Sequence, residues 1–162
     1  MRSPIPSNSL AAVYGLAKDC AERGVAGPNV DLDIYAYDET NTRIRADRLA
    51  SMIERAGDGM VMLVGVQSNQ FPRALDIAAP LRARGIKVCL GGFHASGTIS
   101  MLNGVDPDLD RAKAMGVSVF AGEAEGRLEQ VLQDAAFGAL KPLYARQGLA
   151  ASFAGLPSDR KQ

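Results

Sequence analysis

The chain has 162 residues, of which 47% are apolar and 22% charged, ordinary values for one globular domain. Eighteen basic residues balance eighteen acidic ones, so the composition argues against a nucleic acid or an anionic membrane as partner. No apolar stretch is long enough to cross a membrane, the first twenty residues lack a signal-peptide layout, and the two cysteines lack metal-site spacing. These features predict a cytoplasmic protein in a reducing compartment.

The first third of the chain predicts a helix, a strand and a second helix. Ser9 can cap a helix with one apolar stripe, which ends at Gly24. Residues 30–37, VDLDIYAY, alternate between apolar and polar side chains, which predicts a strand near a sheet edge. After a polar run, a short helix is expected around Leu49.

The middle of the chain has the pattern of one β-α-β unit. Residues 60–66 form an uninterrupted apolar run, as expected for a central parallel strand covered on both faces. Pro72 suits the first turn of the following helix, and Pro80 is expected to kink that helix or restart its last turn. Residues 86–90 predict the next strand.

The last third predicts further helices and one more strand. Residues 98–115 are expected to form one or two short helices, 117–121 a strand and 127–137 a helix. The pattern then weakens, so we expect one α/β domain over residues 1–144 and an irregular tail over 145–162.

This order of elements predicts a doubly wound parallel sheet, Rossmann-like or flavodoxin-like, with three α/β/α layers. Such folds normally open with a strand, which in the flavodoxin-like order lies between the second and third strands. This chain opens with a helix instead. Three interpretations stay open: the first strand is missing, residues 2–7 replace it poorly, or the count of elements is wrong.

Polar residues follow the first of the central strands. Gln67, Ser68 and Asn69 offer donors and acceptors that could hold an amide, a phosphate or a chain of waters. Ligands bind at this edge of open parallel sheets, because the strands stop there and the loops diverge. The alternative is that these side chains only cap the next helix.

Glycines follow the next two strands. Gly91 and Gly92 would let a ligand approach the backbone, and the only histidine, His94, comes next. One histidine without partners makes a weak metal site. Gly122 and Glu123 follow the third strand, although acidic residues before a helix also favour its dipole. The sequence contains neither a nucleotide-binding glycine motif nor a recognisable catalytic triad.

Two strings, VGVQSNQFPRALDIAAPLRARGIKVCLGGFHAS and FAGEAEGRLEQVLQDAAFGALKPLY, resemble the N-terminal cobalamin-binding domain of B12-dependent radical S-adenosylmethionine enzymes. The resemblance runs from about residue 7 to residue 144. It implies a Rossmann-like domain that cups the lower face and the nucleotide tail of a corrinoid. The cofactor-binding residues that it implies are Gln67, Ser68, Asn69, Gly91, Gly92, His94, Gly122 and Glu123.

The chain departs from the family pattern at three places. Gln67 stands where related domains have a tail-binding serine, and Ser68 comes one residue later. The Asp-x-His-x-x-Gly motif is absent, so the resemblance implies base-off cobalamin without a histidine ligand to cobalt. The family's barrel and its Cys-x-x-x-Cys-x-x-Cys motif are also absent, which leaves no [4Fe-4S] cluster or S-adenosylmethionine site in this chain.

We therefore expect a cobalamin-binding domain that is not catalytic alone and that serves a radical S-adenosylmethionine barrel in an intact relative or a partner chain. A competing hypothesis is a degenerate Rossmann-like module without cofactor, which acts in protein–protein interaction or forms a homodimer through open sheet edges. A third is a small flavodoxin-like enzyme or binder that holds a nucleotide or phosphate at the same edge.

Overall fold

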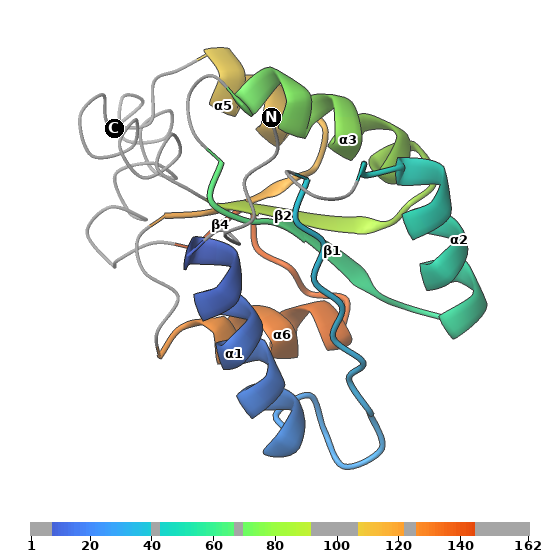
Figure 1. Cartoon of the computed structure of the whole chain (residues 1–162), viewed down its shortest axis with the longest axis vertical. Helices are drawn as coiled ribbons and strands as arrows, with labels where there is room; N and C mark the ends of the chain where they lie inside the picture. Colours follow the sequence, from blue (N-terminus) through green and yellow to red (C-terminus); the bar gives the residue numbers. More distant parts are fainter. Residues whose placement is uncertain (1–7, 40–42, 67–69, 92–106, 122–125, 145–162) are drawn as a thin grey trace, which may run out of the picture.

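The computed structural model describes residues 8–39, 43–66, 70–91, 107–121 and 126–144 (Figure 1). In chain order, its elements are α1 (Asn8–Glu22), α2 (Ala46–Ala56), β1 (Met60–Leu63), α3 (Phe71–Ala83), β2 (Lys87–Gly91), α5 (Pro107–Ala114), β3 (Ser118–Phe120), α6 (Leu128–Ala136) and β4 (Leu143–Tyr144).

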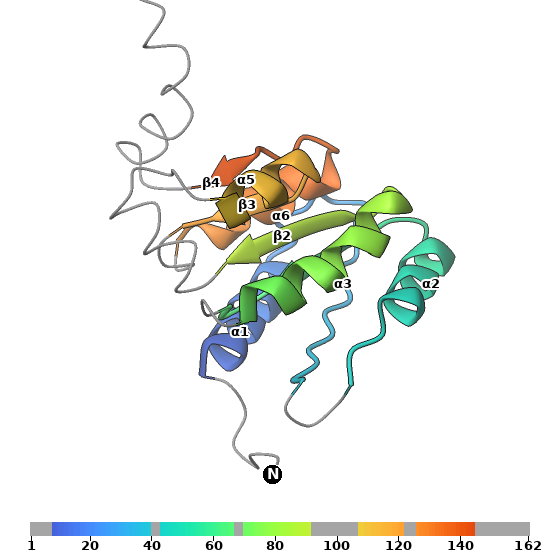
Figure 2. The same cartoon turned by 90° about the horizontal axis from the view of Figure 1, so that it is seen from above.

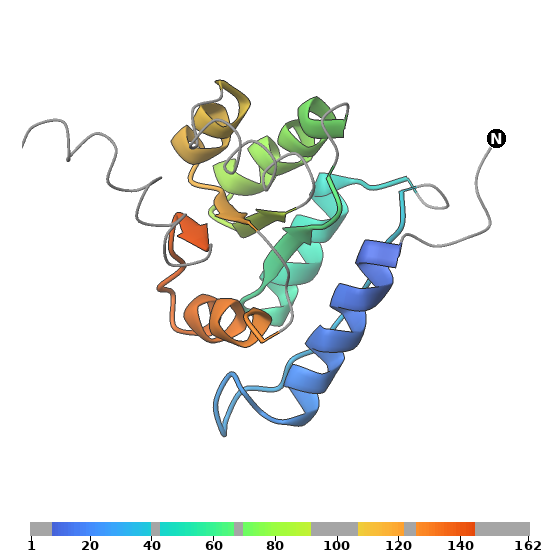
Figure 3. The same cartoon turned by 90° about the vertical axis from the view of Figure 1, so that its left-hand side faces the viewer.

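The four strands form one parallel sheet in the order β1-β2-β3-β4. Helices α2, α3 and α5 cover one face, and Figure 2 shows α3 between the other two. Helices α1 and α6 cover the opposite face (Figures 1 and 3), where Arg23 after α1 reaches Glu129 of α6 at 3.5 Å. The predicted three-layer, Rossmann-like α/β architecture is confirmed.

Alternation along the strands separates two apolar cores. Val88 and Leu90 of β2 point into the core under α2, α3 and α5, where Phe71 of α3 is fully buried. Cys89, between them, points into the second core, under α1 and α6, together with Phe120. Burial of each large apolar side chain contributes about 1.5–3 kcal/mol. Strand β2 is the central strand that is buried on both faces. The run at 60–66 was expected to be central as well, and this is wrong: among the described strands β1 pairs with β2 alone, and its four residues are half-buried.

The prediction of a strand at residues 30–37 is wrong. The segment is extended but pairs with no described strand, although Leu32 and Ile34 pack against the second core while Tyr35 is 64% exposed. In a flavodoxin-like sheet this strand would pair with a strand that precedes α1. No such strand lies among the described residues. The segment therefore has the alternating apolar and polar side chains of an edge strand, but no strand to pair with.

The C-terminal prediction needs one correction. Strand β4 was not expected, because its two residues, Leu143 and Tyr144, directly follow Pro142 and show no periodicity. Of the helices expected over 98–115, the described part is α5, while 98–106 lie outside the described residues.

Helix α3 continues through Pro80, which is exposed, to Ala83.

Candidate functional site

The three predicted loops begin side by side at the carboxyl edge of the sheet. Val66, Gly91 and Ala121 are the last described residues before them. The Val66 N–H donates to the Gly91 carbonyl at 3.2 Å, and Gly91 lies opposite Phe120 of β3. The expected site residues beyond these strand ends, Gln67, Ser68, Asn69, Gly92, His94, Gly122 and Glu123, lie outside the described residues.

Gly91 is the expected site residue that the structure describes, and packing explains it in part. A Cβ at this position would lie 3.3 Å from the Phe120 carbonyl oxygen and 3.4 Å from the Phe120 Cβ. The first distance is tighter than most real Cβ contacts, so a side chain here would require β3 to shift by a few tenths of an ångström. The sequence reading predicted room for a ligand and missed this packing role.

A cation lies beside the third loop, at the end of β3. The Arg127 Nη1 donates to the Ala121 carbonyl at 2.8 Å, and its guanidinium lies 4.6 Å from the centre of the Phe120 ring. Phe120 in turn stacks on Tyr144 with 6.3 Å between ring centres. Arg127 was not among the expected site residues. Its signal in the sequence is its place directly after the glycine- and glutamate-rich turn.

A polar cavity of about 390 Å³ lies beside the first turn of α3, which begins at the same edge of the sheet. Its lining consists of Arg43, Ile44, Arg45, Asp47 and Arg73. Sequence reasoning missed these arginines, because they are separated by the whole of α2 and β1. The signal that could have found them is a pair of arginines before α2 and one after Pro72.

One arginine of this cavity is held in place by an acidic partner. Arg73 donates to both carboxylate oxygens of Glu39, at 2.8 and 3.3 Å, and to the Ile44 carbonyl at 3.2 Å. The hydrogen bond from Arg73 lowers the pKa of Glu39 against the opposing effect of burial, and the charge of Arg43 lowers it further. Glu39 therefore stays ionised and fixes the guanidinium at the cavity wall.

The described residues offer no metal site and no reactive thiol. They contain no group of three or more His, Cys, Asp or Glu side chains that could hold a metal ion. Cys20 and Cys89 are free and buried, and burial raises the pKa of Cys89 to about 12, which keeps it in the unreactive thiol form. None of the described helices is both long and apolar enough to span a bilayer.

Comparison with known proteins gives one structure of similar fold. One solved structure, the N-terminal domain of the hypothetical protein TM0182 from Thermotoga maritima, superposes with a TM-score of 0.52 over 89% of this chain and 96% of that domain. The two sequences are 16% identical, so the likeness extends to the fold alone. The chain matches no protein-family model. A search of curated proteins found no match either.

Proposed function

We propose that this chain is a cobalamin-binding domain that holds the corrinoid base-off, without a histidine ligand to cobalt. The observation that carries the proposal is the adjacency of three strand ends, β1, β2 and β3, at the carboxyl edge of one parallel sheet. The loops of the family resemblance start from these ends. Ligands of open α/β folds bind at this edge.

The described side chains at this edge suit the polar parts of the cofactor. The nucleotide tail of cobalamin carries a phosphodiester, which guanidinium groups recognise through paired hydrogen bonds. Arg43, Arg45 and Arg73 line the cavity beside the first turn of α3, together with Asp47. The Nε and Nη2 groups of Arg73 donate to Glu39 and to the Ile44 carbonyl, which orients the guanidinium and leaves Nη1 for a phosphate oxygen. The cavity therefore supports a site for the tail rather than for the corrin ring.

The proposal is tested by Gly92→Leu, read by the absorption spectrum of bound hydroxocobalamin. Gly92 directly follows β2, where the resemblance has the tail pass close to the backbone. A leucine side chain in that path should weaken corrinoid binding by about tenfold or more, given a clash of about 1–3 kcal/mol.

The matched control is Gly138→Leu, at the opposite end of the molecule, after α6. Its backbone φ of +69° disfavours leucine, so this control carries the cost in stability without touching the proposed site. If Gly92→Leu and the unaltered chain bind hydroxocobalamin with equal affinity, Gly91 and Gly92 are not part of the binding site.

A second candidate function, self-association, is favoured by strand β1. Among the described strands β1 has a neighbour on one side, β2, and its four residues, MVML, are all apolar and half-buried. An uncharged edge strand of this kind is a template for pairing with another chain. A second copy of this chain, joined through β1, would extend the sheet across a two-fold axis.

Sedimentation velocity of Val61→Lys and Val61→Thr tests this second candidate. Lysine is a residue that blocks pairing at sheet edges, whereas threonine keeps the β-branched shape of valine without charge. Pairing through β1 predicts a dimer for the unaltered chain and for Val61→Thr, and a monomer for Val61→Lys. A monomer in all three would eliminate self-association as the function.

A further inference from the structure

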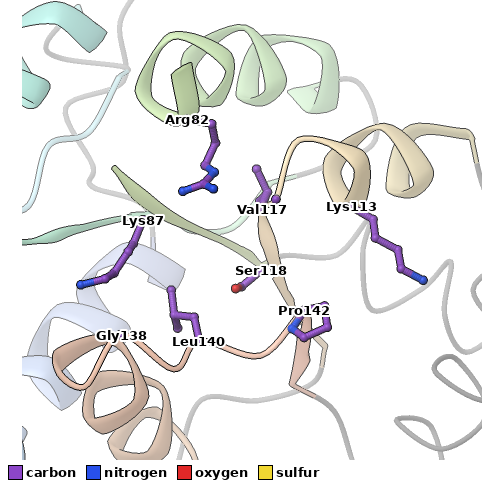
Figure 4. Close-up of a pocket in the computed structure, with 9 residues that line it drawn as sticks. Arg82, Lys87, Lys113, Val117, Ser118, Gly138, Leu140 and Pro142 are labelled. Carbon is purple, nitrogen blue, oxygen red and sulfur yellow. The ribbon is translucent and has the colours of Figure 1, made fainter. Parts of the chain in front are cut away.

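A second cavity, of about 300 Å³, lies at the amino ends of β2, β3 and β4, opposite the proposed cobalamin edge (Figure 4). It is large enough for several waters or a small anion. Its lining includes three basic residues, Arg82, Lys87 and Lys113, and no acidic one. We propose that this cavity binds a phosphate-sized oxyanion at Arg82 and Ser118.

Ser118 is the observation that points to a ligand. It is 4% exposed and is the one buried polar residue of the described part of the chain. Within that part its hydroxyl makes no hydrogen bond, although a buried hydroxyl without a partner is unfavourable. Figure 4 shows the hydroxyl pointing toward the side of the cavity lined by Lys87 and Leu140. An oxyanion there would accept its hydrogen bond.

Arg82 is held so that part of its guanidinium stays available. Its Nε donates to the Met115 carbonyl at 3.1 Å and its Nη1 to the Ile86 carbonyl at 3.0 Å. The Nη2 has no hydrogen-bond partner in the described segments. Gly116 makes this arrangement possible, because a Cβ there would come within 2.9 Å of Nη2. The guanidinium is therefore fixed with one nitrogen left for a ligand.

The charge of the cavity matches an anion. Lys87 and Lys113 also line the cavity, but their side chains point away from Ser118 and Arg82 (Figure 4). The Lys87 Nζ donates to the Asp58 carboxylate at 2.8 and 3.0 Å. A fixed guanidinium and a buried hydroxyl are therefore the donors that would recognise a phosphate oxygen. The site does not depend on the proposed cobalamin function, because it uses the other edge of the sheet.

The test is a titration of the full chain with inorganic phosphate at constant ionic strength, followed through the backbone amide NMR signals of Gly116, Ser118 and Gly138. We expect saturable shifts that sodium chloride does not reproduce. Ser118→Ala should weaken binding by about tenfold, the value of one charge-assisted hydrogen bond. The control, Lys113→Gln, removes a charge of the lining that points away from Ser118 and should stay within about threefold of the unaltered chain.

A stability measurement separates a ligand-binding hydroxyl from a structural one. Without phosphate, Ser118→Ala should unfold at the same or a higher temperature, since it removes a buried donor that has no partner. A lower melting temperature would make Ser118 a structural residue. Phosphate shifts no larger than those with chloride, unchanged affinity in Ser118→Ala, or equal weakening in Ser118→Ala and Lys113→Gln would each overturn the proposal.

Discussion

Burial acts differently on three side chains of the sheet, Cys89, Tyr144 and Ser118. The Cys89 thiol is enclosed by the second core and keeps its proton. The Tyr144 hydroxyl has two hydrogen-bond partners: it donates to a carboxylate and accepts from a backbone N–H. The buried Ser118 hydroxyl has no hydrogen-bond partner in the described part of the chain, so it differs from the other two groups in lacking a favourable contact for its polar atom.

The buried thiol predicts a loss of stability at high pH. Burial raises the pKa of Cys89 from about 9.0 to about 12, so between these values the folded chain keeps a proton that the unfolded chain has released. The free energy of unfolding should therefore be unaffected below pH 9 and fall as the pH rises toward 12, by up to about 1.4 kcal/mol per pH unit. Urea unfolding at pH 8 to 10 measures the slope.

Two alanine variants assign that slope to one thiol. Cys89→Ala should show a shallower fall than the unaltered chain between pH 9 and 10. Cys20→Ala removes the other thiol, whose pKa is raised by burial but lowered by the neighbouring Arg23, and should change the slope less. An identical slope in Cys89→Ala and the unaltered chain would contradict the assignment.

At the scale of elements, hydrogen bonds of one tyrosine join β4 to α6. The Tyr144 hydroxyl donates to Asp134 of α6 at 2.7 Å and accepts the Lys141 N–H at 2.9 Å. Tyr144→Phe leaves both groups short of a partner and should cost about 1–2 kcal/mol of unfolding free energy in urea. Tyr35→Phe, at an exposed tyrosine, should change it by less than about 0.5 kcal/mol. Equal losses of unfolding free energy in the two variants would show that the Tyr144 hydrogen bonds do not hold β4 against α6.

Elements were predictable where the pattern is local. Apolar runs predicted β1 and β2, and the stripe of apolar residues predicted α6, because burial on fixed faces leaves a period in the sequence. The segment 30–37 carries the alternation of a strand, but a strand also needs a partner, which no local pattern records. Strand β4 has the partner without the pattern, since its two residues pair with β3 and the Tyr144 hydroxyl donates to Asp134 of α6.

The same limit applies to the two sites. Loops after consecutive parallel strands must share an edge, so the sequence could predict that the residues before the proposed cobalamin loops lie together. The second cavity joins Arg82, Lys87 and Ser118 from three elements through contacts at the amino ends of the strands. Their convergence depends on tertiary packing and on the close approach at Gly116, neither of which a motif reports.

At the scale of the whole molecule, one sheet separates two polar edges. The carboxyl edge carries the proposed cobalamin loops and the arginine-lined cavity. The amino edge carries the cavity around Ser118. The parallel strands run from one edge to the other and separate them, so ligands at the two edges would not touch. Cobalamin binding at the carboxyl edge is the main proposal, and it rests on the family resemblance.

The most direct test of that claim is titration of the purified chain with hydroxocobalamin, followed by desalting and an absorption spectrum. We predict that the corrinoid stays with the protein after desalting and that its spectrum is of the base-off form. Complete loss of colour from a chain that circular dichroism shows to be folded would contradict the claim, and self-association through β1 would then become the leading function.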